Sequence, residues 1–388
     1  MAVARITAGA LAIGSVLIAV QSVSAVDNIW ALQAVNADGT GADPRVGGDP
    51  YDPNSWVTVE GIALNRSEEY LDPNTTWGPK GMWQIYVQSE DANDPGGGIA
   101  VWHGKIFNPP GWPWPPADVY PGDRVRVVGL IANHNGKVNI NTRHSSDPIM
   151  QFEVTILEPN VGMPAPRQLP TLADCNYFDV TRSGGGELYQ AQWSELNDVW
   201  ITSGTWGKGN TVTLTDASGG QLSMLLSVMG DFDAYPMPTG TFSVRGIFDQ
   251  EDTTIPYHQG YRFWVKRFSD IRYRLTVGVV NGMWGDVEMD PEPEDTNAPK
   301  YTPGTVVMLT AIPISGKYFR HWEIYDPNHP GDGNYVVIDA NNPLVLEMND
   351  RREVAAVFAC SSGLGPMLPG MLGVMGLCAA IRSRRRNR

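Results

Sequence analysis

The sequence predicts an all-β protein built from several domains, and three observations lead to that prediction. Gly (42) and Pro (30) are abundant among the 388 residues, and they are the least favourable residues in helix interiors. A long-helix or coiled-coil protein is therefore excluded. The 42% share of hydrophobic residues, with 13 Trp and 14 Tyr, excludes wholesale disorder. Short alternating runs between turn residues fill most of the chain, which is long enough for two to four domains.

The N-terminus has the features of a secretory signal. Arg5 provides a positive start, residues 8–20 are apolar with small side chains, and Val23-Ser24-Ala25 forms a small-residue cleavage site. We therefore expect a signal peptide over 1–25, processed after Ala25. A transmembrane anchor is the alternative, although the apolar run is short for one. Residues 26–55 are polar and rich in turn residues, and we expect a lead-in there rather than a domain.

Five alternating segments between residues 56 and 160 predict a first β domain. The Asn135-Gly136 turn between the last two is a strong hairpin signal, and a Pro/Trp-rich loop at 108–116 follows the third. The segments are 56–64, 82–89, 97–104, 123–131 and 137–142. Their order is typical of a small five-stranded Greek-key barrel, the OB-fold. The stretch 56–160 resembles the OB-like domains of bacterial extracellular proteins, including domains attached to secreted nucleases.

The same pattern recurs after a Pro-rich linker at 161–175. Residues 219–226 match the strand that begins at 97, and residues 238–248 match the strand at 121–131 in their spacing of Gly and hydrophobic residues. We therefore expect a second OB-like domain over 176–271, produced by tandem duplication. Its outward residues are mostly Thr, which predicts a scaffold or spacer rather than a binding face.

Residues 272–359 differ from both barrels and form a third predicted domain. Short strands alternate there with Gly, Pro and Asn turns. Several residues have the spacing of a known module: Pro303-Gly304, Leu309-Thr310-Ala311, Phe319, Trp322, Pro343 and Phe358. The segment closely resembles the divergent internalin B-repeat of bacterial surface proteins. That resemblance implies a small β-grasp-like domain with a structural or adhesive role and no chemistry.

The C-terminal segment 360–388 begins with Cys360 and has three parts. A short motif is followed by an apolar stretch over 363–381 and then by five arginines. The stretch is close to the length of a membrane-spanning helix, and an arginine cluster after it favours the cytoplasmic side. This arrangement resembles the PEP-CTERM class of sorting signals and its Cys-containing relatives, in which a membrane protease cuts near the motif. A plain hydrophobic tail anchor is the alternative.

Charge and cysteine content restrict the partners. The 28 basic residues include six arginines in the two end segments, which leaves 22 against 42 acidic residues, a net charge of −20, over 26–360. Such a body is poorly suited to nucleic acid, because binding without sequence readout depends on Lys and Arg at the phosphates.

Cys175 is the one cysteine of the folded body, so no internal disulfide framework is expected.

Known catalytic motifs are missing from the sequence. There is no Gly-x-Ser-x-Gly elbow, no His-Glu-x-x-His and no phosphate-binding loop, and the six His residues stand singly without metal-ligand spacing. Acidic pairs such as Asp231/Asp233 and Glu251/Asp252 are expected to be solvated. We therefore expect no enzyme activity, no cofactor and no metal site.

The outer face of the first barrel carries the candidate ligand site. Alternation places Trp83, Ile85 and Val87 inside the barrel, so the residues between them point outward. OB-folds bind oligosaccharides and oligonucleotides on this face, where aromatic rings stack on the ligand. The candidate residues are Gln84, Tyr86, Gln88, Trp102, Trp112, Trp114, Arg124 and Arg126. The alternative is structural: Tyr86 and Trp102 form a cross-strand pair, and the two loop tryptophans cap the barrel.

These observations predict an exported protein held at the cell surface or outer envelope by its C-terminus. We expect a structural or adhesion-type component that presents β binding modules. Oligosaccharide binding by the first OB-like domain is the first alternative, with single-stranded nucleic acid less favoured because of the charge. A role as accessory to an extracellular enzyme such as a nuclease is the second alternative. The expected partners are a sorting protease or the membrane, and a glycan or protein ligand.

Overall fold

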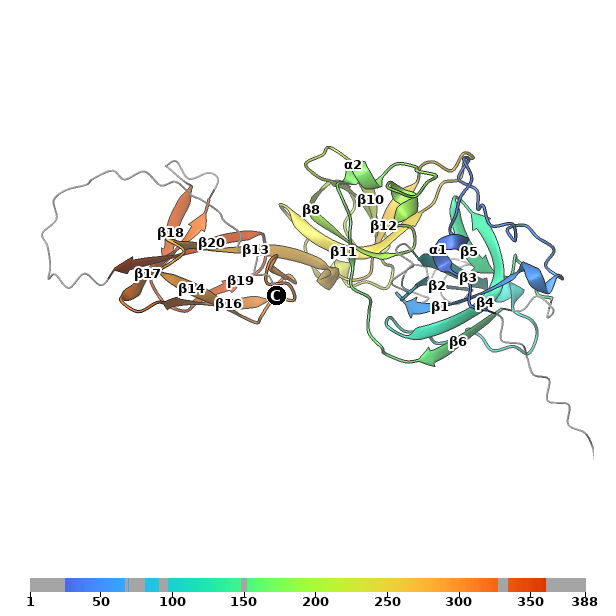
Figure 1. The fold of residues 1–388 in the computed structure, drawn as a ribbon, viewed down its shortest axis with the longest axis horizontal. Coiled ribbons are helices and arrows are strands. Elements are labelled where there is room, and N and C mark those ends of the chain that lie inside the picture. The colour runs from blue at the N-terminus through green and yellow to red at the C-terminus, as the bar shows by residue number, and fades with distance from the viewer. Residues whose placement is uncertain are drawn as a thin grey trace, which may run out of the picture. The chain divides into compact units, whose positions relative to one another are not determined.

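The computed structural model describes residues 25–66, 69, 81–90, 97–147, 152–326 and 334–360. Strands make up 45% of the described residues and helical turns 8%, which confirms the all-β prediction (Figure 1). Two compact units are present: residues 1–276 with 292–307 and 347–352, and residues 277–291 with 308–346 and 353–388. The expected signal peptide, up to residue 24, and the expected sorting segment after Cys360 lie outside the described residues.

The first unit begins with a closed barrel, as expected for an OB-like domain. Its strands are β1 (Trp56–Ala63), β2 (Met82–Gln88), β3 (Gly98–Gly104), β4 (Arg124–His134) and β5 (Lys137–Asn141). They follow the order β1-β2-β3-β5-β4, and pairing of β1 with β4 closes the barrel. Strand β3 runs parallel to β5, and the other pairs in the ring are antiparallel. A sixth strand, β6 (Glu153–Glu158), extends the sheet along β4.

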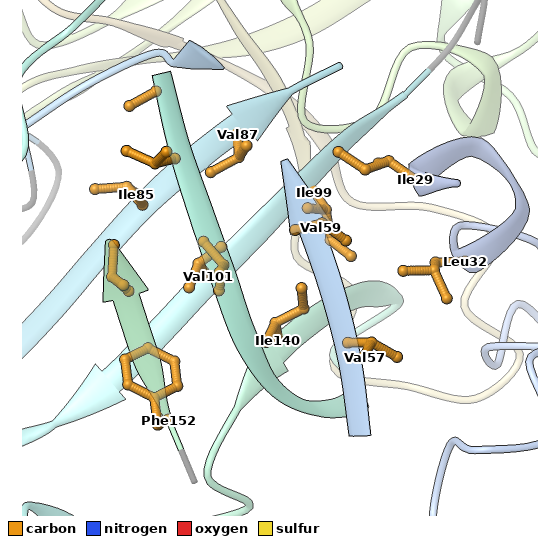
Figure 2. Packing of buried hydrophobic residues seen from close by; sticks show 14 of the residues in the cluster. Ile29, Leu32, Val57, Val59, Ile85, Val87, Ile99, Val101, Ile140 and Phe152 are labelled. Carbon is orange, nitrogen blue, oxygen red and sulfur yellow. The ribbon is translucent and has the colours of Figure 1, made fainter. Parts of the chain in front are cut away.

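The predicted inward residues form the core of this barrel. Trp83, Ile85 and Val87 are at most 1% exposed and pack with Ile99 and Val101 of the neighbouring strand. Figure 2 shows the aliphatic core side chains of β1, β2, β3 and β5 pointing toward one another, with Phe152 at one side. Period-2 alternation therefore predicted the inside of the barrel correctly.

The segment 26–55 does more than lead into the barrel. It contains the short helix α1 (Ile29–Leu32), whose Ile29 and Leu32 are 1% exposed and belong to the barrel core (Figure 2). The side-chain amide of Gln33 donates to the carbonyl of Gly98 at 2.6 Å. One turn of helix therefore buries Ile29 and Leu32 against the barrel, although the segment around it is polar.

A second barrel with the same strand order follows in the first unit. Its strands are β8 (Trp193–Gly204), β9 (Thr211–Thr215), β10 (Gln221–Leu226), β11 (Phe242–Gln250) and β12 (Tyr261–Val265). They follow the order β8-β9-β10-β12-β11, β11 pairs with β8 to close the ring, and β10 runs parallel to β12. Position by position this repeats the first barrel.

Short elements join and flank the two barrels. They are β7 (Arg167–Gln168), α2 (Leu172–Cys175) and the 3-10 turns Pro53–Ser55, Lys105–Phe107, Gly186–Leu188, Phe232–Ala234 and Phe268–Asp270. Cys175 is buried, and burial raises the pKa of its thiol to about 12, so the thiol stays protonated at neutral pH.

The two barrels pack directly against each other within the first unit. Leu64, Tyr86 and Ala100 of the first barrel form an apolar cluster with Trp193 and Ile247 of the second. The approach is close at Gly98, where an added Cβ would lie 2.3 Å from the carbonyl oxygen of Ala191. Only glycine fits this position without a backbone shift. The outer face of β2 and β3 is therefore partly an interface between barrels.

The remaining strands include those of the second unit. They are β13 (Ile271–Val280), β14 (Gly285–Asp290), β15 (Lys300–Tyr301), β16 (Val306–Pro313), β17 (Lys317–Tyr325), β18 (Tyr335–Asp339), β19 (Leu344–Glu347) and β20 (Arg352–Cys360). Strands β14, β16 and β19 form one sheet, and β17 pairs with both β18 and β20. Leu309, Trp322 and Phe358 are at most 2% exposed. Three residues on which the internalin-type resemblance depends are thus core residues.

Candidate functional site

A groove of about 800 Å³ lies on the outer face of the first barrel and is completed by the second. Strands β2, β3 and β5 and the end of β4 line it from the first barrel, and β12 with the residue after β11 lines it from the second. Its lining residues are Met82, Gln84, Ala100, Trp102, Phe107, Ala132, Asn133, His134, Lys137, Asn139, Asn141, Arg143, His144, Glu251, Arg262 and Trp264.

Three aromatic rings form a cluster on one wall of the groove. Trp102 lies on β3, Phe107 ends the 3-10 turn after it, and His144 follows β5. The His144 ring stacks on Phe107 with centroids 4.9 Å apart and meets Trp102 edge-on at 5.0 Å. Arg143 and His144 both have positive φ (49° and 59°), a conformation that non-glycine residues seldom adopt. Such backbone strain is typical of positions that the surrounding fold must hold in place.

A row of polar side chains runs along β5 beside the aromatic cluster. Lys137, Asn139, Asn141 and Arg143 alternate with inward residues, so they share the outer face. The Asn141 amide donates to Asn139 Oδ1 at 2.6 Å, and Asn141 Oδ1 accepts from the Arg143 backbone at 2.5 Å. These bonds fix the orientation of the two amides, each of which has further donor or acceptor capacity.

A buried ion cluster joins the two barrels at the groove. Asp249 on β11 is 1% exposed and accepts from Lys137 at 2.9 Å, from Arg262 at 2.8 Å and from the Trp264 indole at 3.0 Å. Glu251 accepts from Arg262 at 2.8 Å and lies 3.4 Å from Lys137. Burial alone would raise the pKa of Asp249, but Lys137 and Arg262 outweigh it and hold that pKa well below its usual range.

Two of the predicted ligand residues line the groove. Trp102 belongs to the aromatic wall, and Gln84 lies on the neighbouring strand β2. The Gln84 amide donates at 3.0 Å to the hydroxyl of Tyr86, which is itself hydrogen-bonded to Asp249. Gln84 is thus connected to the ion cluster through one intervening hydroxyl.

Tyr86 does not face solvent, contrary to the sequence-based expectation, and Gln88 is only partly exposed. Tyr86 does point out of the first barrel, but the second barrel covers it and leaves it 0% exposed. Burial and the nearby Asp249 raise its pKa well above the usual value. The Gln88 side-chain oxygen accepts from the backbone of Trp193 at 2.8 Å. Both residues hold the barrels together, because the predicted face became an interface.

The other four candidates lie away from the groove. Arg124 pairs with Glu90 at 2.7 Å and with Glu158 at 2.6 Å, and Arg126 pairs with Glu60 at 2.5 Å. Both arginines point outward, but barrel closure places the outer side of this part of β4 beside β1 and β6 rather than beside β2 and β3. Trp114 packs against the barrel core, as the structural alternative expected, whereas Trp112 is 41% exposed and does not cap the barrel.

The two predicted processing residues are both at the surface. Ala25 and Cys360 are exposed, and Cys360 is the last residue of β20. Its thiol lies 2.7 Å from the Lys317 ammonium. Among the helices that the structure describes, none combines the length and apolar character that spanning a bilayer requires.

Sequence reasoning missed the residues of β5 and the contribution of the second barrel. The stretch Lys137 to Asn141 alternates polar and apolar residues, and this pattern predicts an outward polar row. Arg262 and Trp264 alternate with the buried residues of β12, but Trp264 is itself apolar, so the sequence does not distinguish it from a core residue. The Thr-rich strand of the second barrel predicted only a scaffold. Within the described part of the chain, no three His, Cys, Asp or Glu side chains gather as a metal site would require.

Comparisons with known proteins add no assignment to this geometry. No protein-family model matches the chain, and no curated protein matches it.

Proposed function

We propose that this chain is an exported, surface-retained and non-enzymatic protein whose first barrel binds an oligosaccharide in the groove beside the second barrel. The signal-like N-terminus and the sorting-like C-terminus support export and retention. The groove between the barrels supports binding, because clefts of this size with aromatic walls and a few oriented polar groups are the usual form of ligand sites.

One observation carries the proposal: Trp102 and the amides of Asn139, Asn141 and Gln84 line the same groove. A sugar ring has an apolar face and a rim of hydroxyl groups. An indole ring contacts the face, and amides both donate to and accept from the rim. The Asn139–Asn141 and Arg143–Asn141 hydrogen bonds already order the amides of β5. These side chains therefore lose little conformational entropy when a ligand binds.

A structural or adhesion-type role is the second candidate, and the second unit supports it. Several of its strand residues are exposed and apolar, including Val337 on β18 at 58% and Val345 on β19 at 61%. Tyr335 of β18 is exposed as well and pairs with the exposed Tyr325 of β17, and adjoining exposed apolar residues are common at protein contact surfaces. This role and glycan binding are compatible, because they involve different parts of the chain.

The test uses purified protein and tryptophan fluorescence, with oligosaccharides and single-stranded DNA as separate titrants. We expect a saturable response to at least one oligosaccharide. Trp102→Ala should weaken binding by about tenfold or more, as loss of one stacking aromatic removes about 1–3 kcal/mol. Trp112→Ala is the matched control, since Trp112 is exposed and does not line the groove. Equal affinities of W102A and the unaltered protein would refute binding in this groove.

A further inference from the structure

The second barrel contributes three residues to the groove, and they are held in fixed positions. Glu251 follows β11, and Arg262 and Trp264 lie two residues apart on β12. The Trp264 indole nitrogen donates to Asp249, and the Arg262 guanidinium lies over the Trp264 ring, 5.0 Å from its centroid. Trp264 is therefore anchored at its edge and on one face, and it is half-buried at the groove wall.

Three cations line the groove, and each already has acceptors from the protein. Lys137 and Arg262 share the carboxylates of Asp249 and Glu251. Arg143 donates to the backbone carbonyls of Arg45 and Ile131 at 2.6 and 3.1 Å, and also to that of Gly48. An acidic ligand would have to displace these acceptors or lie beside two carboxylates, and breaking a buried ion pair is costly.

The groups that remain suited to a ligand are uncharged. The amides of Gln84, Asn139 and Asn141 offer both donors and acceptors, and Trp102 and Trp264 offer apolar ring surface. Hydroxyl groups match such amides without the desolvation cost of a carboxylate or phosphate. The net charge of −20 over 26–360 also disfavours approach of a polyanion.

We propose that the groove selects a neutral, hydroxyl-rich saccharide and that the second barrel takes part in this selection, with Trp264 contacting the sugar and Glu251 keeping the groove closed to acidic ligands. This inference depends on the proposed function, because it specifies the ligand class of the same groove. It also changes the role of the second barrel from a spacer to one half of a binding site.

The first experiment compares neutral and acidic probes by calorimetry with the full exported chain. The neutral probes are hexasaccharides of glucose, xylose, mannose and N-acetylglucosamine, and the acidic probes are hexagalacturonate and a hyaluronan hexasaccharide. We expect a neutral probe to bind with a Kd that changes by less than about twofold between about 50 mM and about 500 mM NaCl, since no ion pair forms. Preferred binding of an acidic probe, with a Kd that weakens about tenfold over that range, would overturn the neutral-ligand proposal.

Two variants test the part played by the second barrel. Trp264→Ala should weaken binding of the neutral probe by about tenfold. Trp200→Ala is the control, because Trp200 lies on β8 of the same barrel and does not line the groove. Glu251→Gln should introduce salt-sensitive binding of hexagalacturonate, since the loss of this carboxylate leaves Lys137 and Arg262 with one counter-ion fewer.

The outcomes separate this inference from the function on which it depends. If no probe of either class binds, the proposed function fails and this inference fails with it. If a neutral probe binds and W102A abolishes it while W264A has no effect, the groove on the first barrel stands and the role of the second barrel is refuted. If E251Q gains no acidic binding, the exclusion assigned to Glu251 is wrong.

Discussion

Replacing Asp249 by Asn tests whether the buried ion cluster holds the two barrels together. Asp249 is 1% exposed, and its carboxylate accepts from Lys137, Arg262 and Trp264 at 2.8–3.0 Å. Asn has nearly the same shape and keeps one acceptor oxygen, so the change removes mainly the negative charge. The charges of Lys137 and Arg262 would then lie close together across the barrel interface with Glu251 as their remaining shared counter-ion.

The expected loss of stability follows from these contacts. Removing one partner of a buried ion pair costs about 3–5 kcal/mol. Glu251 remains within 3.4 Å of Lys137 and 2.8 Å of Arg262 and offsets part of the loss, so about 3 kcal/mol is expected for the barrel pair. With a denaturant slope of about 3 kcal/mol per M, the urea midpoint should fall by about 1 M.

The assay is urea unfolding followed by tryptophan fluorescence at neutral pH and in acid. The folded pKa of Asp249 is lowered, so its stabilising effect is present above about pH 4 and is lost as the pH falls through the folded value. The gap between D249N and the unaltered protein should therefore narrow in acid. Glu158→Gln is the control, because its pair with Arg124 is exposed and contributes less than about 1 kcal/mol. A D249N midpoint equal to that of E158Q would refute a stabilising ion cluster.

Two further predictions concern a second buried carboxyl and the C-terminal segment. Burial raises the pKa of Glu187 to about 7 despite hydrogen bonds from Tyr261 and Gln190, so stability should fall as the pH rises from about 4.5 to about 7. Glu187→Gln should remove that slope in urea midpoints measured across this range, and parallel profiles of the two proteins would contradict it. Deleting residues 360–388 should release the protein into the medium of its host, as measured by fractionation and intact mass; retention of the shortened chain would remove the sorting-signal proposal.

The local structure of both barrels could be predicted because it follows from short-range pattern. Alternation placed Trp83, Ile85 and Val87 in the core, and Asn135-Gly136 predicted the turn between β4 and β5. These inferences depend only on which face of a strand is apolar and on which residues tolerate a tight turn, and neither requires knowledge of distant parts of the chain.

The candidate site was predicted only in part, because its boundaries depend on distant contacts. Alternation correctly placed Tyr86 and Trp102 outside the first barrel. The second barrel covers Tyr86 but leaves Trp102 at the wall of the groove, and nothing in the local sequence of the two residues distinguishes them. The exposure of an outward residue is decided by what packs against it, and here the partner lies more than a hundred residues further along the chain.

The sequence by itself determined the β class, the repeated strand order and the inward face of each strand, since these follow from residue periodicity and turn chemistry. Tertiary structure alone decided that Lys137 and Arg262, separated by 125 positions, share the carboxylate of Asp249. It also decided that Trp102 and Trp264 line one groove. The physical reason is that packing between the barrels brings together side chains that are far apart in the sequence, and sequence separation does not predict distance in space.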